Sequence, residues 1–342
     1  MGGCDAMNDF MFLMTKPFGS RFDNWSENSS DIFSNSMLDA VYIPTLANKG
    51  APVSNIYTLL KYANEIVLIY SNEVAAWSKQ YSNNIRVERI NTHKDFCTNY
   101  YSKAENQNIS VQWRPSFDIP LKRSFALFDA KKRSYKKILL LDDDIFISDK
   151  NIGCGISGLL AGSSIVGFHV VDFPDVSTID HIERIVNKKN NIISMTGSCM
   201  FLNVDFIEGD FLNIYNEDLF FFLTQPKPDK VVSGGIIYQK PYVPWTNLSR
   251  IQHEQFGDLI YDAFKKRFLG LSYGLIDWGE EIKNRIDTIK LMYSRTEDKD
   301  ILCALDAAVR ALQEINIHDI EHFLEHGKFA PWAIKYASFE TH

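Results

Sequence analysis

The chain has 342 residues, of which 45% are hydrophobic and 23% charged, a composition typical of a soluble protein with one large domain or two modest ones. Its formal net charge of −7 argues against a general nucleic-acid-binding protein, because such proteins usually carry an excess of basic residues. The five cysteines are scattered, without a CxxC pair or zinc-ligand spacing, so the sequence favours a reduced, cytoplasmic setting.

The chain begins with a stretch rich in Ser, Asn and Asp, residues 1–36, which is predicted to be a loosely structured lead-in. Its apolar segment MNDFMFLM lacks a basic region and a clear cleavage site, so no signal peptide is predicted. The elements expected next alternate along the chain: a strand at 39–45, a helix at 56–63, a strand at 65–73, a helix at 74–81 and a strand at 84–91. This alternation predicts a mainly parallel sheet covered by helices on both faces.

A further helix is predicted from about Pro120, and it leads into a strand at Lys137–Leu141. The uninterrupted apolar run ILLL is typical of a central strand, and ligands in open α/β sheets bind beyond the carboxyl ends of such strands. Asp142, Asp143 and Asp144 follow at that end. Three adjacent carboxylates repel one another, so their presence suggests that a cation lies nearby.

In an extended chain, Asp142 and Asp144 point to one side of the strand and Asp143 to the other. Two such carboxylates make half of a site for a hard divalent cation such as Mg²⁺ or Mn²⁺, which completes its shell with water and substrate phosphates. The alternative is a solvated acidic turn after the strand, because aspartates are common in turns.

The second half of the chain is more mixed. The most apolar window, residues 152–173, contains glycines, serines, His169 and Asp172, so it is interpreted as a short helix followed by a buried strand and not as a membrane span. Another strand is expected within 191–207, and from about Gly257 onward the pattern becomes helical. The predicted parts of the chain are therefore a lead-in at 1–36, an α/β domain at 37–258 and a helical C-terminal extension at 259–342.

Five short motifs occur in order along the α/β part: VYIPT (Val41–Thr45), LKRSFAL (Leu121–Leu127), Asp142-Asp143-Asp144, TGSCMFL (Thr196–Leu202) and YNEDLFF (Tyr215–Phe221). Together they resemble the pattern of GT-A-fold, family 2-like glycosyltransferases, which use nucleotide-sugar donors and carry an Asp-x-Asp motif at the end of a strand. The resemblance covers about Asp39 to Asp258. It implies a Rossmann-like, mainly parallel mixed sheet flanked by helices, with 37–258 as the catalytic domain.

For the metal ion, the resemblance implies Asp142 and Asp144 as ligands and His253 as a third ligand or phosphate contact. An imidazole ligand suits Mn²⁺ better than Mg²⁺. A lone histidine is usually structural, and His169 and His181 are weaker candidates for the same role.

The resemblance also implies a UDP- or GDP-sugar donor. Its contacts are expected from eight residues: Pro44, Thr45, Ser71, Asn72, Lys122, Arg123, Asp142 and Asp143. Lys122 and Arg123 fall in a predicted first helical turn, where backbone N–H groups also favour anions, although both can instead be surface cations. Many family members carry an acidic residue after the second strand, whereas this chain has Ser-Asn-Glu, so the base is left undecided.

Glu217 and Asp218 precede the aromatic run LFFF. A carboxylate against apolar walls has a raised pKa, which suits a general base. By its place in the motif Asp218 is the expected base, and Glu217 is expected to hydrogen-bond the acceptor. The alternative is that Asn216 or Asp218 caps the helix that follows. Trp245 can stack on an acceptor sugar or simply pack.

The expected function is therefore metal-dependent, inverting transfer of a sugar from a nucleotide-diphosphate sugar to a hydroxyl of a carbohydrate or other acceptor. In this scheme Asp218 removes the acceptor proton while the metal-bound diphosphate leaves; a retaining enzyme of the same fold is the first alternative. No transmembrane segment or nucleic-acid partner is expected. The sequence leaves open whether the C-terminal helices shape the acceptor pocket, support a homodimer or contact a membrane surface.

Three other classes compete with this interpretation. A phosphohydrolase of the haloacid dehalogenase type also places Asp-x-Asp after an apolar strand, but it expects a small Thr soon afterwards, where this chain has Ile145-Phe146. A nucleotidyltransferase expects a Gly-rich basic loop, which PTLANKGAP approaches only faintly. A non-catalytic sugar-binding protein would retain the acidic residues at the cost of buried, unpaired charge.

Overall fold

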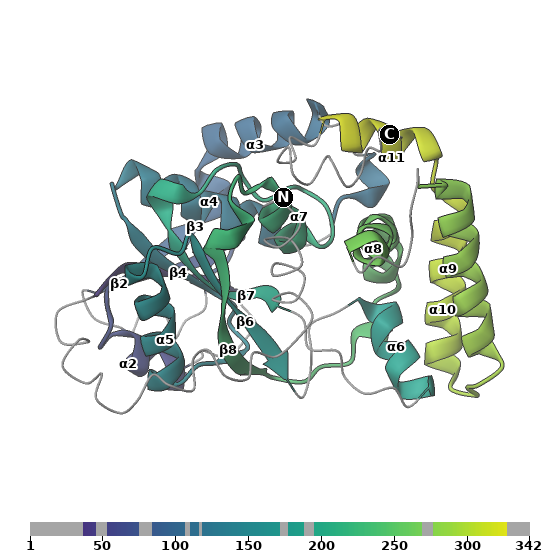
Figure 1. Ribbon diagram of the computed structural model, residues 1–342, viewed down its shortest axis with the longest axis horizontal. Coiled ribbons are helices and arrows are strands. Elements are labelled where there is room, and N and C mark those ends of the chain that lie inside the picture. Colours follow the sequence, from purple (N-terminus) through teal and green to yellow (C-terminus); the bar gives the residue numbers. More distant parts are fainter. Residues whose placement is uncertain are drawn as a thin grey trace, which may run out of the picture.

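The computed structural model describes residues 37–45, 53–74, 84–106, 110–115, 118–171, 177–187, 195–268 and 276–326. The predicted lead-in at 1–36 and most of the predicted helix at 74–81 lie outside the described residues. Within them the chain forms a mixed α/β fold, in which helices flank a twisted sheet and further helices gather at the C-terminal end (Figure 1). The predicted fold class is confirmed at this level.

The strands of the described part form one sheet with the order β3-β2-β1-β4-β7-β6-β8-β5. Its first half is parallel and consists of β1 (Leu38–Pro44), β2 (Ala63–Tyr70), β3 (Ile85–Arg89) and β4 (Lys137–Leu141). The second half is mixed and consists of β7 (Met195–Asn203), β6 (Ile165–Val171), β8 (Val231–Gln239) and β5 (Ile145–Phe146). Strand β7 runs antiparallel to both β4 and β6, so this half of the sheet is mixed, as predicted.

Strand β4 lies in the middle of the sheet between β1 and β7. Ile138 and Leu140 belong to the hydrophobic cluster on one face, and Leu139 and Leu141 belong to the cluster on the other. All four side chains are buried because helices cover both faces, which explains why the sequence shows a continuous apolar run and no alternation.

The helices around the sheet begin with α2 (Val53–Leu59), α3 (Lys94–Asn106), α4 (Ile119–Lys132) and α5 (Asp149–Leu160). Helix α5 has a capping box, in which Ser148 accepts a hydrogen bond from the Asn151 backbone N–H and Asn151 accepts one in return. Since α5 is followed by the buried strand β6, the apolar window 152–173 is a helix and a strand, as predicted. Among the described helices, none has the length and apolar character needed to cross a membrane.

The later helices are α6 (Thr178–Asn187), α7 (Glu217–Thr224), α8 (Leu248–Phe268), α9 (Trp278–Tyr293), α10 (Lys299–Glu314) and α11 (Ile317–His326). Helix α10 buries Ile301, Leu305 and Leu312 of the predicted apolar stripe. Helix α8 runs without interruption through the predicted division at 258/259.

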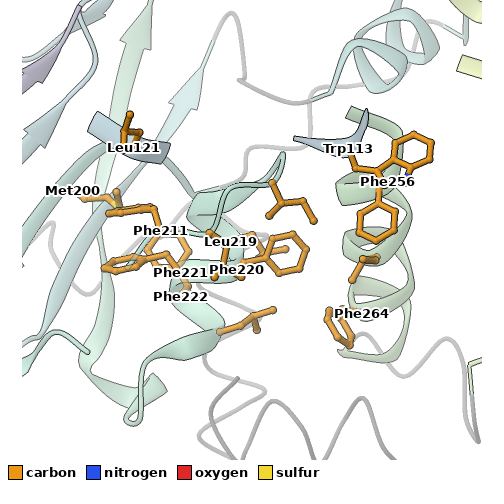
Figure 2. Packing of buried hydrophobic residues seen from close by; sticks show 14 of the residues in the cluster. Trp113, Leu121, Met200, Phe211, Leu219, Phe220, Phe221, Phe222, Phe256 and Phe264 are labelled. Atoms are coloured by element: carbon orange, nitrogen blue, oxygen red, sulfur yellow. The ribbon is translucent and has the colours of Figure 1, made fainter. Parts of the chain in front are cut away.

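Aromatic side chains join the C-terminal helices to the sheet. Figure 2 shows Phe211 and Phe221 packed together near Met200 of β7, with Phe220 facing toward α8, and Trp113 stacked on Phe256 of α8. The ring centroids are 4.0 Å apart for Phe211 and Phe221 and 5.7 Å apart for Trp113 and Phe256. These residues belong to one hydrophobic cluster, so α7 is packed between the sheet and the C-terminal helices.

Gly155 on α5 marks a close approach between this helix and β7. A Cβ atom at this position would lie 2.4 Å from the ring of the fully buried Phe201. We expect Gly155→Ala to lower the free energy of unfolding by about 1–3 kcal/mol, because overpacking outweighs the gain of about 1 kcal/mol in helix propensity. Chemical denaturation measures the change.

The matched control is Gly279→Ala on α9, where the nearest atoms to a Cβ are 3.3 and 3.9 Å away. This control is expected to change stability by less than about 0.5 kcal/mol, as an exposed substitution usually does. Equal unfolding midpoints for the two variants would contradict the close packing of α5 on β7.

Candidate active site

The candidate site lies at the carboxyl end of β4. Strand β4 ends at Leu141, and the Asp142 backbone N–H donates to the Ser198 carbonyl of β7 at 2.8 Å. Residues 143 and 144 then form a turn. The side-chain alternation expected of an extended chain therefore does not continue through the three aspartates, and each contacts a different part of the fold.

Arg123, the fifth residue of α4 and so just past its first turn, holds two acidic segments together. Its Nη2 donates to both carboxylate oxygens of Asp142, each at 2.9 Å, and its Nη1 donates to Glu217 Oε1 at 2.6 Å. The residue is 4% exposed, so the alternative that it is a surface cation is wrong. Burial alone lowers the pKa of Arg123, but the carboxylates of Asp142 and Glu217 raise it above its ordinary value.

Lys122 is fully buried and fixes the end of β1. Its Nζ donates to the Thr45 carbonyl at 3.0 Å and pairs with Asp118 at 2.8 Å. The Thr45 hydroxyl in turn donates to Asp143 Oδ2 at 2.7 Å. Lys122 is therefore not a surface cation either; its ammonium group joins the start of α4 to the loop after β1.

Asp144 lies toward the other edge of the sheet. Its Oδ2 accepts a long hydrogen bond of 3.4 Å from Gln239 Nε2, and its carbonyl accepts from the Lys240 N–H at 2.8 Å. Asp142, by contrast, is engaged by Arg123 through both oxygens. Asp144 therefore contacts the end of β8, whereas Asp142 contacts α4.

The predicted three-residue metal set does not assemble. Among the described residues, no three or more His, Cys, Asp or Glu side chains are grouped so that they could hold a metal ion. His253 lies on α8, where its Nδ1 is 3.5 Å from Ser249 Oγ and burial lowers its pKa. The reason is the fold: α8 belongs to the C-terminal helices, whereas Asp142 and Asp144 follow β4. His169 is buried in β6 and His181 in α6.

Helix α7 begins with Glu217 and Asp218, directly after Asn216. Asn216 occupies the N-cap position in a left-handed conformation with φ 63° and ψ 32°, and its side chain makes no capping hydrogen bond. The Asp218 carboxylate accepts from the Leu219 N–H at 2.8 Å and from the Gly197 N–H of β7 at 2.5 Å. The capping alternative therefore fails for the Asn216 side chain, and Asp218 is oriented by backbone groups of two elements.

Glu217 is buried, and burial raises its pKa to about 8. The positive charge of Arg123 acts against this shift, while the charges of Asp218 and Asp142 reinforce it. Glu217 and Asp218, although adjacent, thus have different surroundings: Glu217 faces the guanidinium group, and Asp218 is half-buried against Gly197.

Gly197 is a site residue that was not among the predicted ones. A Cβ atom there would lie 2.6 Å from Arg123 Nη1 and 2.6 Å from Asp218 Cβ. Only glycine lets the arginine and the aspartate approach the strand this closely. The available signal was a glycine inside an otherwise apolar strand, which often marks a close approach of another group.

The remaining predicted donor residues follow the neighbouring parallel strands. Pro44 ends β1, and Ser71 and Asn72 follow β2, which pairs with β1. Strands β1, β2 and β4 are parallel, so their carboxyl ends lie on the same side of the sheet. Ser71 is half-buried there and Asn72 is exposed. Trp245 packs partly buried against the main hydrophobic cluster, in agreement with the packing alternative.

Comparison with known families gives no assignment from sequence: no family model matches the chain. No curated protein matches it significantly either.

Solved structures show a distant likeness. Glucosyl-3-phosphoglycerate synthase of M. tuberculosis is 11% identical over 67% of this chain and 78% of its own, with a TM-score of 0.43. A Desulfovibrio desulfuricans protein described as a nucleotide-diphospho-sugar transferase is 8% identical over 74% and 97%, with a TM-score of 0.34. The 4-diphosphocytidyl-2C-methyl-D-erythritol synthase of Anaerococcus prevotii is 11% identical over 65% and 99%, with a TM-score of 0.32. Likeness of this degree does not identify an activity.

The raised pKa of Glu217 predicts a pH-dependent contribution to stability. Because the value of about 8 lies above the ordinary 4.5, the folded protein holds this proton more tightly than the unfolded chain does. The contribution is full below the ordinary pKa and is lost as the pH rises through the folded-state value. We expect Glu217→Gln to gain stability relative to the wild type as the pH rises from about 5 to about 9.

Urea unfolding at a series of pH values measures this difference, with the exposed Glu325→Gln of α11 as the control. Arg123, Asp142, Asp218 and Tyr100 are the titratable neighbours present in both proteins. A difference in stability that stays constant over the whole pH range would show that Glu217 is ionised throughout.

Proposed function

We propose that this protein is a glycosyltransferase that moves a sugar from a nucleotide-diphosphate sugar to an acceptor hydroxyl, with inversion. The observation that carries the proposal is the Asp142–Arg123–Glu217 contact. It joins the end of β4, which has Asp144 on it, to the start of α7, which has Asp218 on it. Asp144, proposed to hold the donor, and Asp218, proposed to activate the acceptor, are thereby held in place by the same buried contact.

The donor half of the proposed site consists of the loops after β1, β2 and β4. Thr45, Ser71 and Asn72 are proposed to contact the nucleoside, with the end of β1 held in place by Lys122. Asp144 is proposed to hold Mg²⁺ or Mn²⁺ together with the donor diphosphate. When bound, the metal ion would neutralise the negative charge that develops on the leaving diphosphate.

The acceptor half is the start of α7. Asp218 is the proposed base: it is partly accessible, and two backbone N–H groups fix the direction of its carboxylate. In the transfer step the acceptor oxygen loses its proton to Asp218 and bonds to the anomeric carbon as the bond to the diphosphate breaks. Glu217 is proposed to hold the first turn of α7 against α4 through its buried hydrogen bond from Arg123.

The sequence argued against a non-catalytic protein because such a protein would retain buried, unpaired charge. The structure removes this argument. Arg123 pairs with Asp142, and Glu217, whose pKa is raised to about 8, is protonated near neutral pH, so retaining these residues does not leave a buried negative charge uncompensated. Measured turnover must therefore separate the enzyme from a binding protein.

The test is a panel of UDP- and GDP-sugars, scored by release of nucleoside diphosphate with and without Mn²⁺. We expect at least one donor to be hydrolysed slowly in the presence of the metal, because water can replace the acceptor. Asp144→Ala should abolish metal-dependent binding of the nucleoside diphosphate, measured by calorimetry. The control is Asp205→Ala, whose carboxylate pairs with Lys136 on the surface.

Two outcomes would contradict the proposal. Nucleoside-diphosphate affinity that is the same in Asp144→Ala as in the wild type refutes the metal assignment. A wild-type protein that neither hydrolyses nor binds any member of the panel refutes the glycosyltransferase function.

The base assignment predicts a separable effect. Asp218→Asn should leave the dissociation constant of the donor unchanged and slow transfer by roughly 10²–10⁴-fold, the usual contribution of a general base. Single-turnover kinetics with saturating donor measures the step. A near-normal rate would assign proton removal to another group.

A further inference from the structure

A buried arginine on the C-terminal helices has a network of its own. Arg285 of α9 donates from Nη2 to Asp258 Oδ2 at 2.7 Å, forms a second ion pair with Asp262, and donates from Nε to Gln255 at 3.3 Å. The side chains of Arg285 and Asp258 are 8% and 4% exposed. This network fixes the Asp258 carboxylate on α8 in one orientation.

The second oxygen of that carboxylate reaches the candidate active site. Asp258 Oδ1 accepts a hydrogen bond of 3.0 Å from the Asn216 side-chain amide. Asn216 immediately precedes Glu217 and Asp218, and its carbonyl accepts from the Phe220 N–H at 3.1 Å, which closes the first turn of α7. A continuous chain of contacts thus runs from Arg285 through Asp258 to the residue that starts α7. Helix α8 lies between α7 and the pair α9 and α10 (Figure 1).

The backbone geometry supports the same connection independently. A Cβ atom at Gly257, next to Asp258, would lie 2.2 Å from the Tyr215 carbonyl oxygen. Helix α8 therefore touches the segment before α7 at two successive residues, through the backbone at Tyr215 and through the side chain at Asn216.

The conformation of Asn216 needs such support. Its backbone is left-handed, a region that is uncommon for residues other than glycine, although asparagine enters it more readily than most, and a contact with α8 stabilises it there. An asparagine at an N-cap ordinarily satisfies the first N–H groups of its own helix. Here the side chain turns away from α7 and bonds to α8 instead.

We infer that Arg285, Asp258 and Asn216 form a positioning relay, through which the C-terminal helices set the direction of Glu217 and Asp218. The part of this inference that concerns turnover rests on the proposed function. The relay makes α8 and α9 part of the active-site framework. None of its three residues is proposed to touch the substrate.

The test uses the full chain with three variants: Asn216→Gly, Arg285→Met and Arg285→Lys. Asn216→Gly keeps the left-handed backbone accessible and removes the side chain with its amide. We expect it to speed hydrogen exchange in the peptide covering α7, including the Phe220 amide, and to lower kcat by roughly 10–100-fold with the donor KM unchanged, because small misplacements of a catalytic group have large effects on rate.

Arg285→Met should produce the same two effects. Arg285→Lys retains a positive charge opposite Asp258, so it should recover part of both the exchange protection and the rate. A merely structural role would lower thermal stability without a split between kcat and KM and without this rescue. The control is Arg310→Met, which removes an exposed ion pair with Asp306 on α10 and should change neither readout.

Hydrogen exchange tests the relay and turnover tests the proposed function, so the failure of one can be distinguished from the failure of the other. If the wild type transfers no sugar, the proposed function fails, while hydrogen exchange still tests the relay. If Asn216→Gly and Arg285→Met remain folded and show wild-type exchange in α7, the relay is refuted. Faster exchange with unchanged kcat refutes its role in catalysis.

Discussion

The site depends on one buried guanidinium group. Arg123 donates hydrogen bonds to Asp142, 19 residues away in sequence, and to Glu217, 94 residues away, with distances between 2.6 and 2.9 Å. Without it, an acidic strand end and an acidic helix start would face each other inside the protein. Removing one partner of such a buried ion pair typically costs about 3–5 kcal/mol, because a charge is left uncompensated in a medium of low polarity. Three consecutive aspartates can follow a buried strand because each has its own partner: Arg123 for Asp142, the Thr45 hydroxyl for Asp143 and the Gln239 amide for Asp144.

Other features of the fold make room for this contact and hold it. Gly197 lets Arg123 and Asp218 approach β7, and Lys122 anchors the start of the same helix to the end of β1. The start of α7 is held on one side by Arg123 and on the other by α8, through Asn216 and Asp258. The aromatic core that includes Phe220 and Phe256 spans both regions, so the C-terminal helices and the sheet bury a common apolar surface.

Local patterns in the sequence predicted most of the described fold. The strand at Lys137–Leu141, the helix from Pro120 and the helix and strand of the apolar window appear where periodicity and apolar runs indicated them. Asp142, which follows β4, and Glu217 of α7 both contact Arg123. The roles of Asn216 and Gly197 were missed, because they depend on residues that are close in space but distant in sequence.

The sequence by itself determined the order of the elements and the chemical types at their ends, because hydrophobic periodicity and chain direction are local properties. The tertiary structure decided which charges meet. It buried Lys122 and Arg123, and it paired Asp142 with an arginine instead of leaving it open to a cation. Among the described residues, it also kept His253 from joining Asp142 and Asp144 in a three-ligand cluster. The physical reason is that an ion pair depends on distances of a few ångströms between side chains from distant segments, and these distances exist only after the helices have packed on the sheet.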